Sequence, residues 1–492
     1  MTNLLKMMIL DSFKRNSLTV LFCSLPFFAE SYSTGWSNDF SYLQKNYSQI
    51  RTFENYLFPP QLENRREYTQ ITQLKTHSTL ILKDGKIIYE KYAKGYHKHR
   101  PQKLWSVSKA VTNLLIGIAV RENKISIQDT ICSYFKSYEM KFDCKKMTIK
   151  DILGWSSGLH WREMLTEPLS SSVFNMLYNK AGYKDAASFI LSHPLIRKPG
   201  TSWHYSSGDT NLLMAILSQV YKPSEYAVLP WTKLFNELGI QSAVWETDSK
   251  GVFHGCCSLY MTTRDLARIG EFMLNKGRWL GKDFFPEDWI NHYVQSISPA
   301  FLNDPVAIRE QIVPSFQWWV NKPSRHKQVL KPRALQSAPE DLYLAIGYAG
   351  QLLFIIPSMN MVIVRTGSFD ADVYLDTNAL VGLALGIVTG KQYAQPIRQT
   401  FVPFSIGREY DSPRKYSYNS AGVMNNFLAK EMCSCMFVEG RNEFSCLEQF
   451  KPLKSRWQNI SVSKPTKSVK VSALGWSAGR AHYSGRYGCY LH

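Results

Sequence analysis

Short β-rich runs of hydrophobic residues lie at both ends of the central part of the chain. Residues 78–91 form two β-rich runs around Asp84-Gly85, which predicts a hairpin with a tight turn. Residues 352–365 repeat this pattern around a turn at Pro357–Asn360. Strands that enclose a helical middle predict an α+β fold, in which an antiparallel sheet is flanked by helices and carries an inserted helical lobe.

Helical patterns lie between and after these strands. The dense apolar run 110–120 predicts a buried helix, and residues 258–275 predict an amphipathic helix capped by Thr262 or Thr263. Residues 122–250 have a mainly helical, loop-rich pattern. A further apolar helix is predicted from about Asn378 to Val388.

The composition changes to Gln, Pro, Arg, Tyr and Ser near residue 390, which marks a linker. Beyond it, short alternating runs such as Ser468–Leu474 predict strands in a small module that contains four cysteines. The predicted organisation is a signal peptide at 1–31, an N-terminal extension at 32–69, a main domain at 70–390, a linker at 391–425 and a small Cys-containing, β-rich C-terminal module at 426–492.

The first 31 residues have the pattern of a secretory signal. Lys6, Lys14 and Arg15 precede the apolar stretch 18–28, and small residues allow cleavage after Ser31. No later run reaches about eighteen apolar residues, so the mature protein is not expected to span a membrane. We therefore expect an exported protein, either periplasmic or secreted.

The composition is that of a folded globular protein, with 45% hydrophobic and 20% charged residues. The formal net charge is +19, and residues 391–492 hold 15 Lys and Arg against 6 Asp and Glu. Two interpretations fit this excess: general solubility, or affinity for nucleic acid, anionic lipid or acidic components of a cell envelope. No nucleic-acid-binding motif of interleaved basic and aromatic residues is present.

Removal of the signal would leave an even number of cysteines, which predicts disulfides in an exported protein. Cys132 and Cys144 are close enough in sequence to close one loop. Two adjacent cysteines, Cys256 and Cys257, are interpreted as small buried residues beside a helix. The four C-terminal cysteines could form two bridges in a pairing that the sequence leaves open; they are Cys433, Cys435, Cys446 and Cys489. A zinc site there is the alternative, but Cys433-Ser-Cys435 lacks the usual two-residue gap and no paired histidine follows.

The strongest chemical signal is Ser106-Val-Ser-Lys109, at the start of the apolar run 110–120. A serine three residues before a lysine places a hydroxyl and an amine on one face of a helix. The positive end of the helix dipole favours a deprotonated oxygen, and burial lowers the pKa of a lysine from about 10.4. These features predict a serine nucleophile that needs no histidine.

The same four-residue spacing occurs at Ser133, Ser324 and Ser461, so the motif alone is not specific. The copies at 324 and 461 lie in polar, basic surroundings with no apolar helix behind them. Ser106 is distinguished by the dense apolar helix that follows and by Trp105 before it.

Two further segments could join Ser106. The polar loop His204–Asn211 precedes the apolar run 212–220 and could bring the Tyr205 phenol near the serine. The segment Gly347–Gln351 precedes a predicted strand, and its glycines would let the backbone approach a ligand.

Taken in order, Ser106-Val-Ser-Lys109, Tyr205-Ser-Ser207 and Tyr348-Ala-Gly350 resemble the three motifs of the serine β-lactamase and penicillin-binding-protein superfamily. The likeness is to its class C-like esterases and amide hydrolases, including 6-aminohexanoate-dimer hydrolase, and covers about residues 70–390. The resemblance implies a β-lactamase-like fold and an acyl-enzyme mechanism without cofactor or metal. Ser106 would be the nucleophile, and Lys109 with Tyr205 the general base and acid. The N–H groups of Ser106 and Gln351 would form the oxyanion hole, and Ser207, Tyr348, Ala349 and Gly350 would bind substrate.

The third motif departs from the β-lactamase pattern, because Tyr348-Ala349-Gly350 offers no lysine to attract a substrate carboxylate. The resemblance therefore implies a small ester or amide as substrate rather than a penicillin or cephalosporin. The alternatives are β-lactamase or D-amino-acid peptidase activity, or a catalytically silent relative that binds the cell wall.

Two other types of site have partial matches in the sequence, the nucleophile motif of α/β-hydrolases and a pair of histidines. The α/β-hydrolase motif G-x-S-x-G occurs at Gly154–Gly158 and Gly475–Gly479, but neither has a strand before it and a helix after it in the predicted pattern. His97 and His99 lie in a basic loop, where solvated side chains are expected rather than metal ligands.

Overall fold

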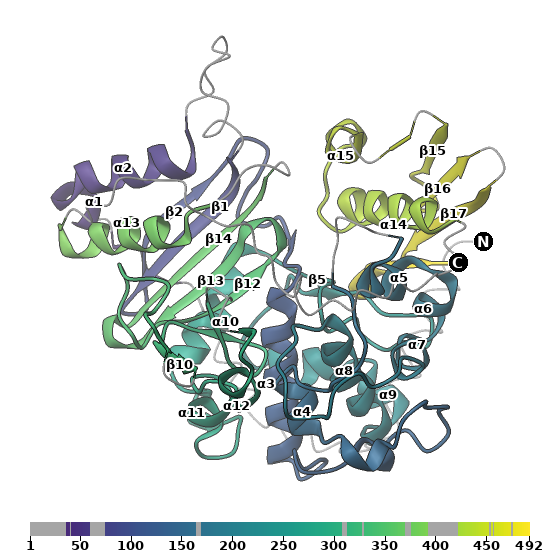
Figure 1. Cartoon of the computed structure of the whole chain (residues 1–492). Helices are drawn as coiled ribbons and strands as arrows, with labels where there is room; N and C mark the ends of the chain where they lie inside the picture. Colours follow the sequence, from purple (N-terminus) through teal and green to yellow (C-terminus); the bar gives the residue numbers. More distant parts are fainter. Residues whose placement is uncertain are drawn as a thin grey trace, which may run out of the picture. The chain divides into compact units, whose positions relative to one another are not determined.

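The computed structural model describes residues 36–39, 41–59, 74–163, 169–307, 312–326, 329–369, 375–391, 422–451, 454–455, 457–473 and 476–492. The predicted signal peptide and most of the predicted linker lie outside these residues. The largest sheet has seven strands in the order β2-β1-β14-β13-β12-β9-β8, and all neighbours in it are antiparallel (Figure 1). The strands are β1 Leu74–Lys83, β2 Lys86–Tyr92, β8 Val313–Pro314, β9 Trp319–Val320, β12 Tyr343–Gly347, β13 Gln351–Ile356 and β14 Met361–Phe369.

Helices cover both faces of this sheet, which explains why β13 is buried along its whole length. Because residues paired across antiparallel strands share a face, Leu353 and Val362 lie on one face, and Tyr89 on the other. Gly270 of α10 (Thr263–Leu274) approaches Val362 so closely that an added Cβ would lie 2.4 Å from its Cγ1. Phe53 of α2 (Tyr47–Leu57) packs edge-on against Tyr89, with ring centroids 5.3 Å apart. Both predicted hairpins and the α+β fold are therefore confirmed.

The N-terminal helices α1 (Ser41–Lys45) and α2 pack against α13 (Thr377–Thr389), near the other end of the main domain. Asn46 donates a hydrogen bond to the carbonyl of Ile387 at 2.8 Å, and Tyr56 donates one to the carbonyl of Asp376 at 2.9 Å. Figure 1 shows α2 and α13 side by side along the large sheet. The described part of the predicted N-terminal extension is thus packed on the main domain.

In the sequence the helical lobe lies between β3 (Gln102–Lys103) and β4 (Val244–Trp245). Its helices are α3 Val107–Arg121, α4 Ile149–Leu153, α5 Ser172–Tyr178, α6 Lys180–Lys184, α7 Ala186–Leu191, α8 Ser207–Val220 and α9 Pro223–Tyr226, with short turns of helix at Ile131–Ser133, Cys144–Lys146 and Trp231–Phe235. The sequence placed the apolar helix at 212–220, whereas α8 begins five residues earlier. The cause is the Ser206 hydroxyl, which caps the helix by accepting a hydrogen bond from the N–H of Asp209 at 3.0 Å.

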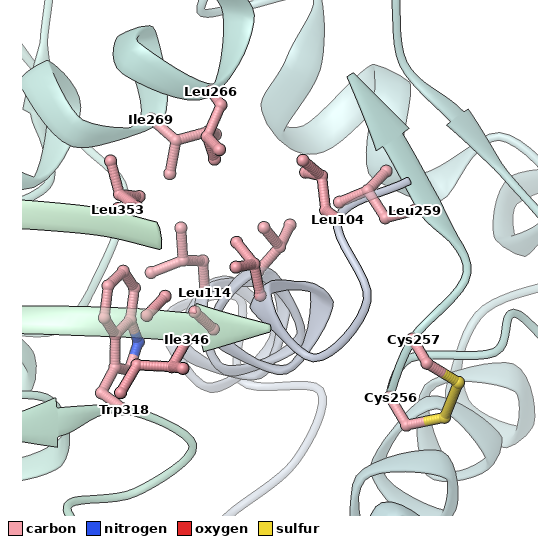
Figure 2. Packing of buried hydrophobic residues seen from close by; sticks show 14 of the residues in the cluster. Leu104, Leu114, Cys256, Cys257, Leu259, Leu266, Ile269, Trp318, Ile346 and Leu353 are labelled. Carbon is pink, nitrogen blue, oxygen red and sulfur yellow. A yellow bond between two sulfur atoms is a disulfide. The ribbon is translucent and has the colours of Figure 1, made fainter. Parts of the chain in front are cut away.

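Helix α3 runs through the core, where it packs against α8 of the lobe on one side and against the large sheet on the other. Leu114 of α3 lies near Ile346 of β12, with Leu353, Leu266 and Ile269 around them (Figure 2). A small sheet ordered β3-β5-β4 leads into this helix; its strands are β3 Gln102–Lys103, β4 Val244–Trp245 and β5 Leu259–Met261. The remaining elements of the main domain are α11 Trp289–Tyr293, α12 Pro299–Asn303 and the hairpins β6 Arg278–Trp279 with β7 Lys282–Asp283 and β10 Ser324–His326 with β11 Val329–Lys331. No described helix is both long enough and apolar enough to cross a membrane.

The C-terminal segment consists of two helices and a four-stranded antiparallel sheet. Its elements are α14 Val423–Phe437, α15 Glu443–Phe450, β15 Gln458–Ser463, β16 Ser468–Ala473, β17 Trp476–Tyr483 and β18 Cys489–Leu491. Strand β16 confirms the strand predicted at 468–474, whereas α14 and α15 have no counterpart among the predictions. We call residues 422–492 the C-terminal module.

Disulfides tie the described cysteines in pairs. Cys132 is bonded to Cys144, as the sequence predicts, and the open C-terminal pairing is Cys433–Cys489 and Cys435–Cys446. Cys256 and Cys257 are buried, as interpreted, but they are not simply small packing residues, because they also form a disulfide with each other (Figure 2). Adjacent cysteines can form a disulfide without closing a loop, so their spacing in the sequence gave no sign of the bond.

Candidate active site

Ser106 lies at the start of α3, where Lys109 follows it by one turn. The Ser106 hydroxyl does not cap the helix. Instead it lies 3.1 Å from Nζ of Lys109, the side chain that the sequence pairs with it. Trp105, directly before the serine, has a φ of +49°, a backbone conformation that is uncommon for a bulky residue and is held only where its surroundings fix it.

Lys109 is almost completely buried, with 1% of its surface exposed. Its Nζ also donates hydrogen bonds to Oγ of Ser207 at 2.9 Å and to the carbonyl of Cys256 at 3.1 Å. Burial lowers the pKa of Lys109 to about 8, although the nearby Glu163 carboxylate acts in the opposite direction. A sizeable fraction of this lysine is therefore neutral near pH 8 and able to accept a proton.

Tyr205 packs against the ammonium group and the nucleophile. The Nζ of Lys109 lies 4.7 Å from the centre of its ring. Two buried tryptophans hold the ring: Trp155 at 4.9 Å and Trp319 at 5.9 Å between centroids. Burial, followed by the charge of Glu163, raises the pKa of Tyr205 well above its ordinary value, while a hydrogen bond to Ser106 lowers it. The phenol therefore keeps its proton at neutral pH.

Glu163 is a member of the site that the sequence prediction missed. Its carboxylate accepts hydrogen bonds from the backbone N–H of Ser207 at 3.0 Å, from the Ser207 hydroxyl, and from the indole N–H of Trp161 at 2.7 Å. The Ser207 hydroxyl thus connects Glu163 to Lys109. The sequence signal for it is weak, a single acidic residue two positions after Trp161 in a segment without an apolar pattern.

The segment Gly347–Gln351 lies against Leu104, two residues before the nucleophile. Gly347 lies so close to the carbonyl of Leu104 that an added Cβ would be 2.3 Å from it, so only glycine fits. The half-exposed ring of Tyr348 packs edge-on against Trp105, with centroids 5.4 Å apart. The turn that follows has positive φ at Ala349 and Gly350.

A buried arginine supports this turn from behind. Arg365 donates hydrogen bonds to the carbonyls of Ala349 at 3.1 Å and Gly350 at 2.7 Å. The side chain of Gln351 exchanges two hydrogen bonds with the backbone of Gly367. The role of the Gln351 N–H in an oxyanion hole stays a prediction.

The structure therefore brings together Ser106, Lys109, Tyr205 and Ser207, and it places Tyr348–Gly350 beside Trp105. The serine of the first G-x-S-x-G segment does not join this group, because Ser156 follows α4 and donates its hydroxyl to the carbonyl of Asp151, although Trp155 beside it packs against Tyr205. The second copy begins outside the described residues and continues into β17. In the part of the chain that the structure describes, the one cluster with metal-ligand spacing is Cys132, Asp143 and Cys144, and its two cysteines are bonded to each other.

Comparison with known proteins shows the family to which the chain belongs. The sequence pattern of the beta-lactamase family matches residues 65–368. The 6-aminohexanoate-dimer hydrolase of Paenarthrobacter ureafaciens is 23% identical over 342 residues, which cover 67% of this chain and 80% of that protein. An uncharacterized protein of Alkalihalophilus pseudofirmus is 23% identical over 318 residues, 61% of this chain and 86% of its own length.

Two solved structures share the fold. EstCE1, described as a hydrolase with promiscuous acyltransferase activity, aligns with a TM-score of 0.51 at 14% identity, over 70% of this chain and 98% of its own. A penicillin-binding-protein homologue from Caulobacter crescentus aligns with a TM-score of 0.51 at 13% identity, over 72% of this chain and 99% of its own. The chain belongs to the beta-lactamase family. It is a hydrolase with the β-lactamase-like fold and, in general terms, a serine hydrolase.

Proposed function

We propose that the chain hydrolyses a small ester or amide through an acyl-enzyme formed on Ser106. The observation that carries this proposal is the contact between the Ser106 hydroxyl and Lys109, whose burial gives it a pKa of about 8. A neutral amine at hydrogen-bond distance can accept the serine proton as the oxygen attacks a carbonyl carbon. The name of the Paenarthrobacter relative, a hydrolase of an amide-linked dimer, supports the same reaction class.

The two proton carriers take different roles in this proposal. Lys109 titrates near neutral pH and acts as the base during attack by Ser106. Tyr205 keeps its proton and donates it to the leaving alkoxide or amine, after which Lys109 returns a proton to the phenol. In the second half, water attacks the acyl carbonyl and gives a proton to the same pair, which returns it to Oγ of Ser106 as the bond between this oxygen and the acyl carbon breaks and the acid leaves. The N–H groups of Ser106 and Gln351 would stabilise the oxyanion in both halves.

The third segment favours esters and amides without a carboxylate beside the scissile bond. Tyr348–Gly350 contributes no cationic side chain, and the guanidinium of Arg365 is fully buried behind the turn, where it binds the loop carbonyls. A substrate carboxylate would therefore find no positive side chain from this segment.

A fluorophosphonate probe tests the nucleophile directly. The wild-type chain should gain one covalent label, located by peptide mass spectrometry on Ser106, and Ser106→Ala should gain none. Parallel assays with short p-nitrophenyl esters, nitrocefin and a D-amino-acid peptide then test the substrate class, and the esters should give the highest kcat/KM. A label that survives Ser106→Ala would overturn the proposal, the absence of any label would favour a silent binding protein, and nitrocefin as best substrate would favour a β-lactamase.

The charge of Glu163 should set the pH at which the enzyme becomes active. Glu163 stabilises the charged form of Lys109, so Glu163→Gln should lower the pKa of that lysine further. Because the neutral lysine is the active form, the acid limb of the kcat/KM profile should move to lower pH. Profiles from pH 5 to 10, with the exposed Glu448→Gln as control, measure this shift; a limb that stays in place or moves upward would show that Glu163 does not act on the titrating group.

We also propose that the chain is exported to the periplasm or the medium. The four disulfides support this, because such bonds persist in oxidising compartments. Cell fractionation followed by N-terminal sequencing tests it; a cytoplasmic chain that retains residues 1–31 would overturn it.

A further inference from the structure

The C-terminal module places buried charges against the main domain. Lys430 and Glu431 of α14 are 2% and 4% exposed. Buried charges occur where they are paired, because an unpaired one is costly. Two disulfides fix this helix within the module, Cys433–Cys489 to β18 and Cys435–Cys446 to α15. The residues that pair with Lys430 and Glu431 therefore show which parts of the main domain the module contacts.

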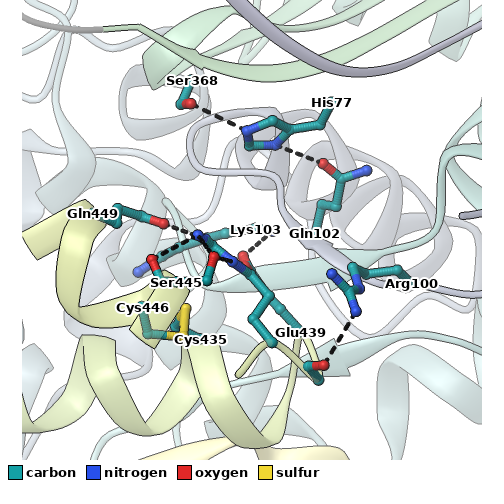
Figure 3. Close-up of polar contacts among 12 residues, drawn as sticks. His77, Arg100, Gln102, Lys103, Ser368, Cys435, Glu439, Ser445, Cys446 and Gln449 are labelled. Carbon is teal, nitrogen blue, oxygen red and sulfur yellow. Dashed lines mark hydrogen bonds and ion pairs between the residues drawn. A yellow bond between two sulfur atoms is a disulfide. The ribbon is translucent and has the colours of Figure 1, made fainter. Parts of the chain in front are cut away.

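Glu431 binds Lys103, which lies three residues before the nucleophile. The Lys103 ammonium donates to Oε1 of Glu431 at 2.5 Å, and the Tyr178 hydroxyl donates to the same oxygen at 2.8 Å. The backbone N–H of Lys103 donates to Glu439 at 3.3 Å (Figure 3). Both the side chain and the backbone of Lys103 are thus held by carboxylates of the C-terminal module.

A further contact joins the same junction near these residues. Arg100 donates a hydrogen bond to the carbonyl of Gly440 at 3.2 Å, and Glu439 lies 3.5 Å from Arg441 in an ion pair. Figure 3 shows Arg100, Lys103 and Glu439 together, next to the Cys435–Cys446 disulfide. The chain that enters the active site is therefore anchored on the module at residues 100 and 103.

Lys103 also contacts Trp105, the residue directly before the nucleophile. Its ammonium lies over the ring of Trp105, 4.1 Å from the centroid, a distance that gives a cation–π interaction. Trp105 is only partly buried, as is Ser106 next to it, and it packs against the half-exposed ring of Tyr348. We call Trp105 and Tyr348, which pack together beside the nucleophile, the aromatic wall.

We propose that the C-terminal module is a positioning element of the active site. Glu431 and Glu439 fix Lys103, Lys103 fixes Trp105, and the aromatic wall binds the acyl group of substrates that carry an aromatic or other bulky apolar ring. This inference rests on the proposed hydrolase function and adds its substrate class. The proposal also explains the positive φ of Trp105, since the Lys103 ammonium, which is paired with Glu431 of the module, holds the indole ring in place.

The test compares aromatic and small acyl groups on the full-length protein. Glu431→Gln removes the charge that fixes Lys103 and keeps the side-chain shape. The ratio of kcat/KM for p-nitrophenyl phenylacetate to that for p-nitrophenyl acetate should fall about tenfold, through KM, since offset or edge-on ring contacts contribute on this scale. Lys103→Met is the second variant, which keeps the stem of the side chain and should give the same fall if Glu431→Gln folds poorly.

Two controls separate positioning from general stability. Lys430→Met breaks the other buried ion pair across the junction, with Glu246, and should leave the substrate ratio within twofold of wild type. Glu448→Gln alters an exposed ion pair in the same module and should change neither ratio nor melting temperature. An equal fall in the ratio for Glu431→Gln and Lys430→Met would overturn the proposal, because the module would then act through stability alone.

A double-mutant cycle and a binding measurement complete the test. Trp105→Leu should lower the ratio, and Glu431→Gln should add little to it in that background, because both changes act on the same wall. Full additivity would contradict the proposal. In the Ser106→Ala background, binding of p-nitrophenyl phenylacetate, measured by fluorescence titration, should weaken about tenfold with Glu431→Gln. This second arm needs no turnover, so its failure is distinct from failure of the proposed hydrolase reaction.

Discussion

Replacing Lys109 with methionine should lower kcat/KM for p-nitrophenyl esters by about 10³-fold, the usual contribution of a general base and equivalent to about 4 kcal/mol of activation free energy. Methionine fills the same buried space but cannot accept the proton of Ser106, which lies 3.1 Å from the lysine nitrogen. The wild-type rate should rise with pH through about 8, as the lysine loses its proton. In the variant this rise should disappear, and profiles of kcat/KM from pH 6 to 10 measure both effects.

The same variant should not lose stability at neutral pH. The folded state lowers the pKa of Lys109 from 10.5 to about 8, so between these values the unfolded chain binds more protons and stability increases with pH. Below pH 8 the full cost of burying the ammonium remains, about 3 kcal/mol for a shift of this size. Lys109→Met removes that cost but leaves the Ser207 hydroxyl and the Cys256 carbonyl without a donor. A melting temperature equal to or above that of wild type, together with lost activity, would separate catalysis from folding; an active variant with an unchanged pH profile would show that another group is the base.

Local patterns were sufficient to predict the elements that hold the candidate site. The hairpin around Asp84 is marked by β-rich runs on both sides of a turn dipeptide, and the helix behind Ser106 by a dense apolar run, and both patterns indicate buried elements. The order of the three motifs that begin at Ser106, Tyr205 and Tyr348 carried the resemblance to a known family, and the fold that it implied is the one observed. The start of α8 was missed because a polar first turn, Ser207–Asn211, has the composition of a loop until the Ser206 cap is seen.

The contacts that tune the site have no local signature. Glu163 and Ser207 are far apart in the sequence, and neither lies in an apolar pattern that would indicate burial of a carboxylate. Lys103 and Glu431 are separated by 328 positions, and each alone is typical of an exposed charge. Only the fold shows that these two side chains form an ion pair, and this pair joins the C-terminal module to β3, the strand before the nucleophile.

The most stabilising of these distant pairs is expected to be Glu246 with Lys430. Glu246 is fully buried, and its carboxylate accepts hydrogen bonds from the Lys430 ammonium, from the Ser434 hydroxyl at 2.5 Å and from the backbone N–H of Cys489 at 3.3 Å. Glu246→Gln keeps the shape and an acceptor but leaves a buried ammonium without its counter-charge. Removing one partner of a buried ion pair costs about 3–5 kcal/mol of the free energy of unfolding.

The double variant Glu246→Gln/Lys430→Met should recover most of this loss. An amide beside a thioether leaves no buried charge, and replacing a whole buried pair by groups of similar volume is often close to neutral. Urea denaturation of the oxidised protein, followed by both fluorescence and circular dichroism, measures the three variants, and coincident curves justify a two-state treatment. A double variant as unstable as the sum of the single ones would contradict direct pairing. Recovery in the double variant would show that Glu246 and Lys430 pair directly across the junction, and coincident curves would show that the C-terminal module and the main domain unfold as one unit.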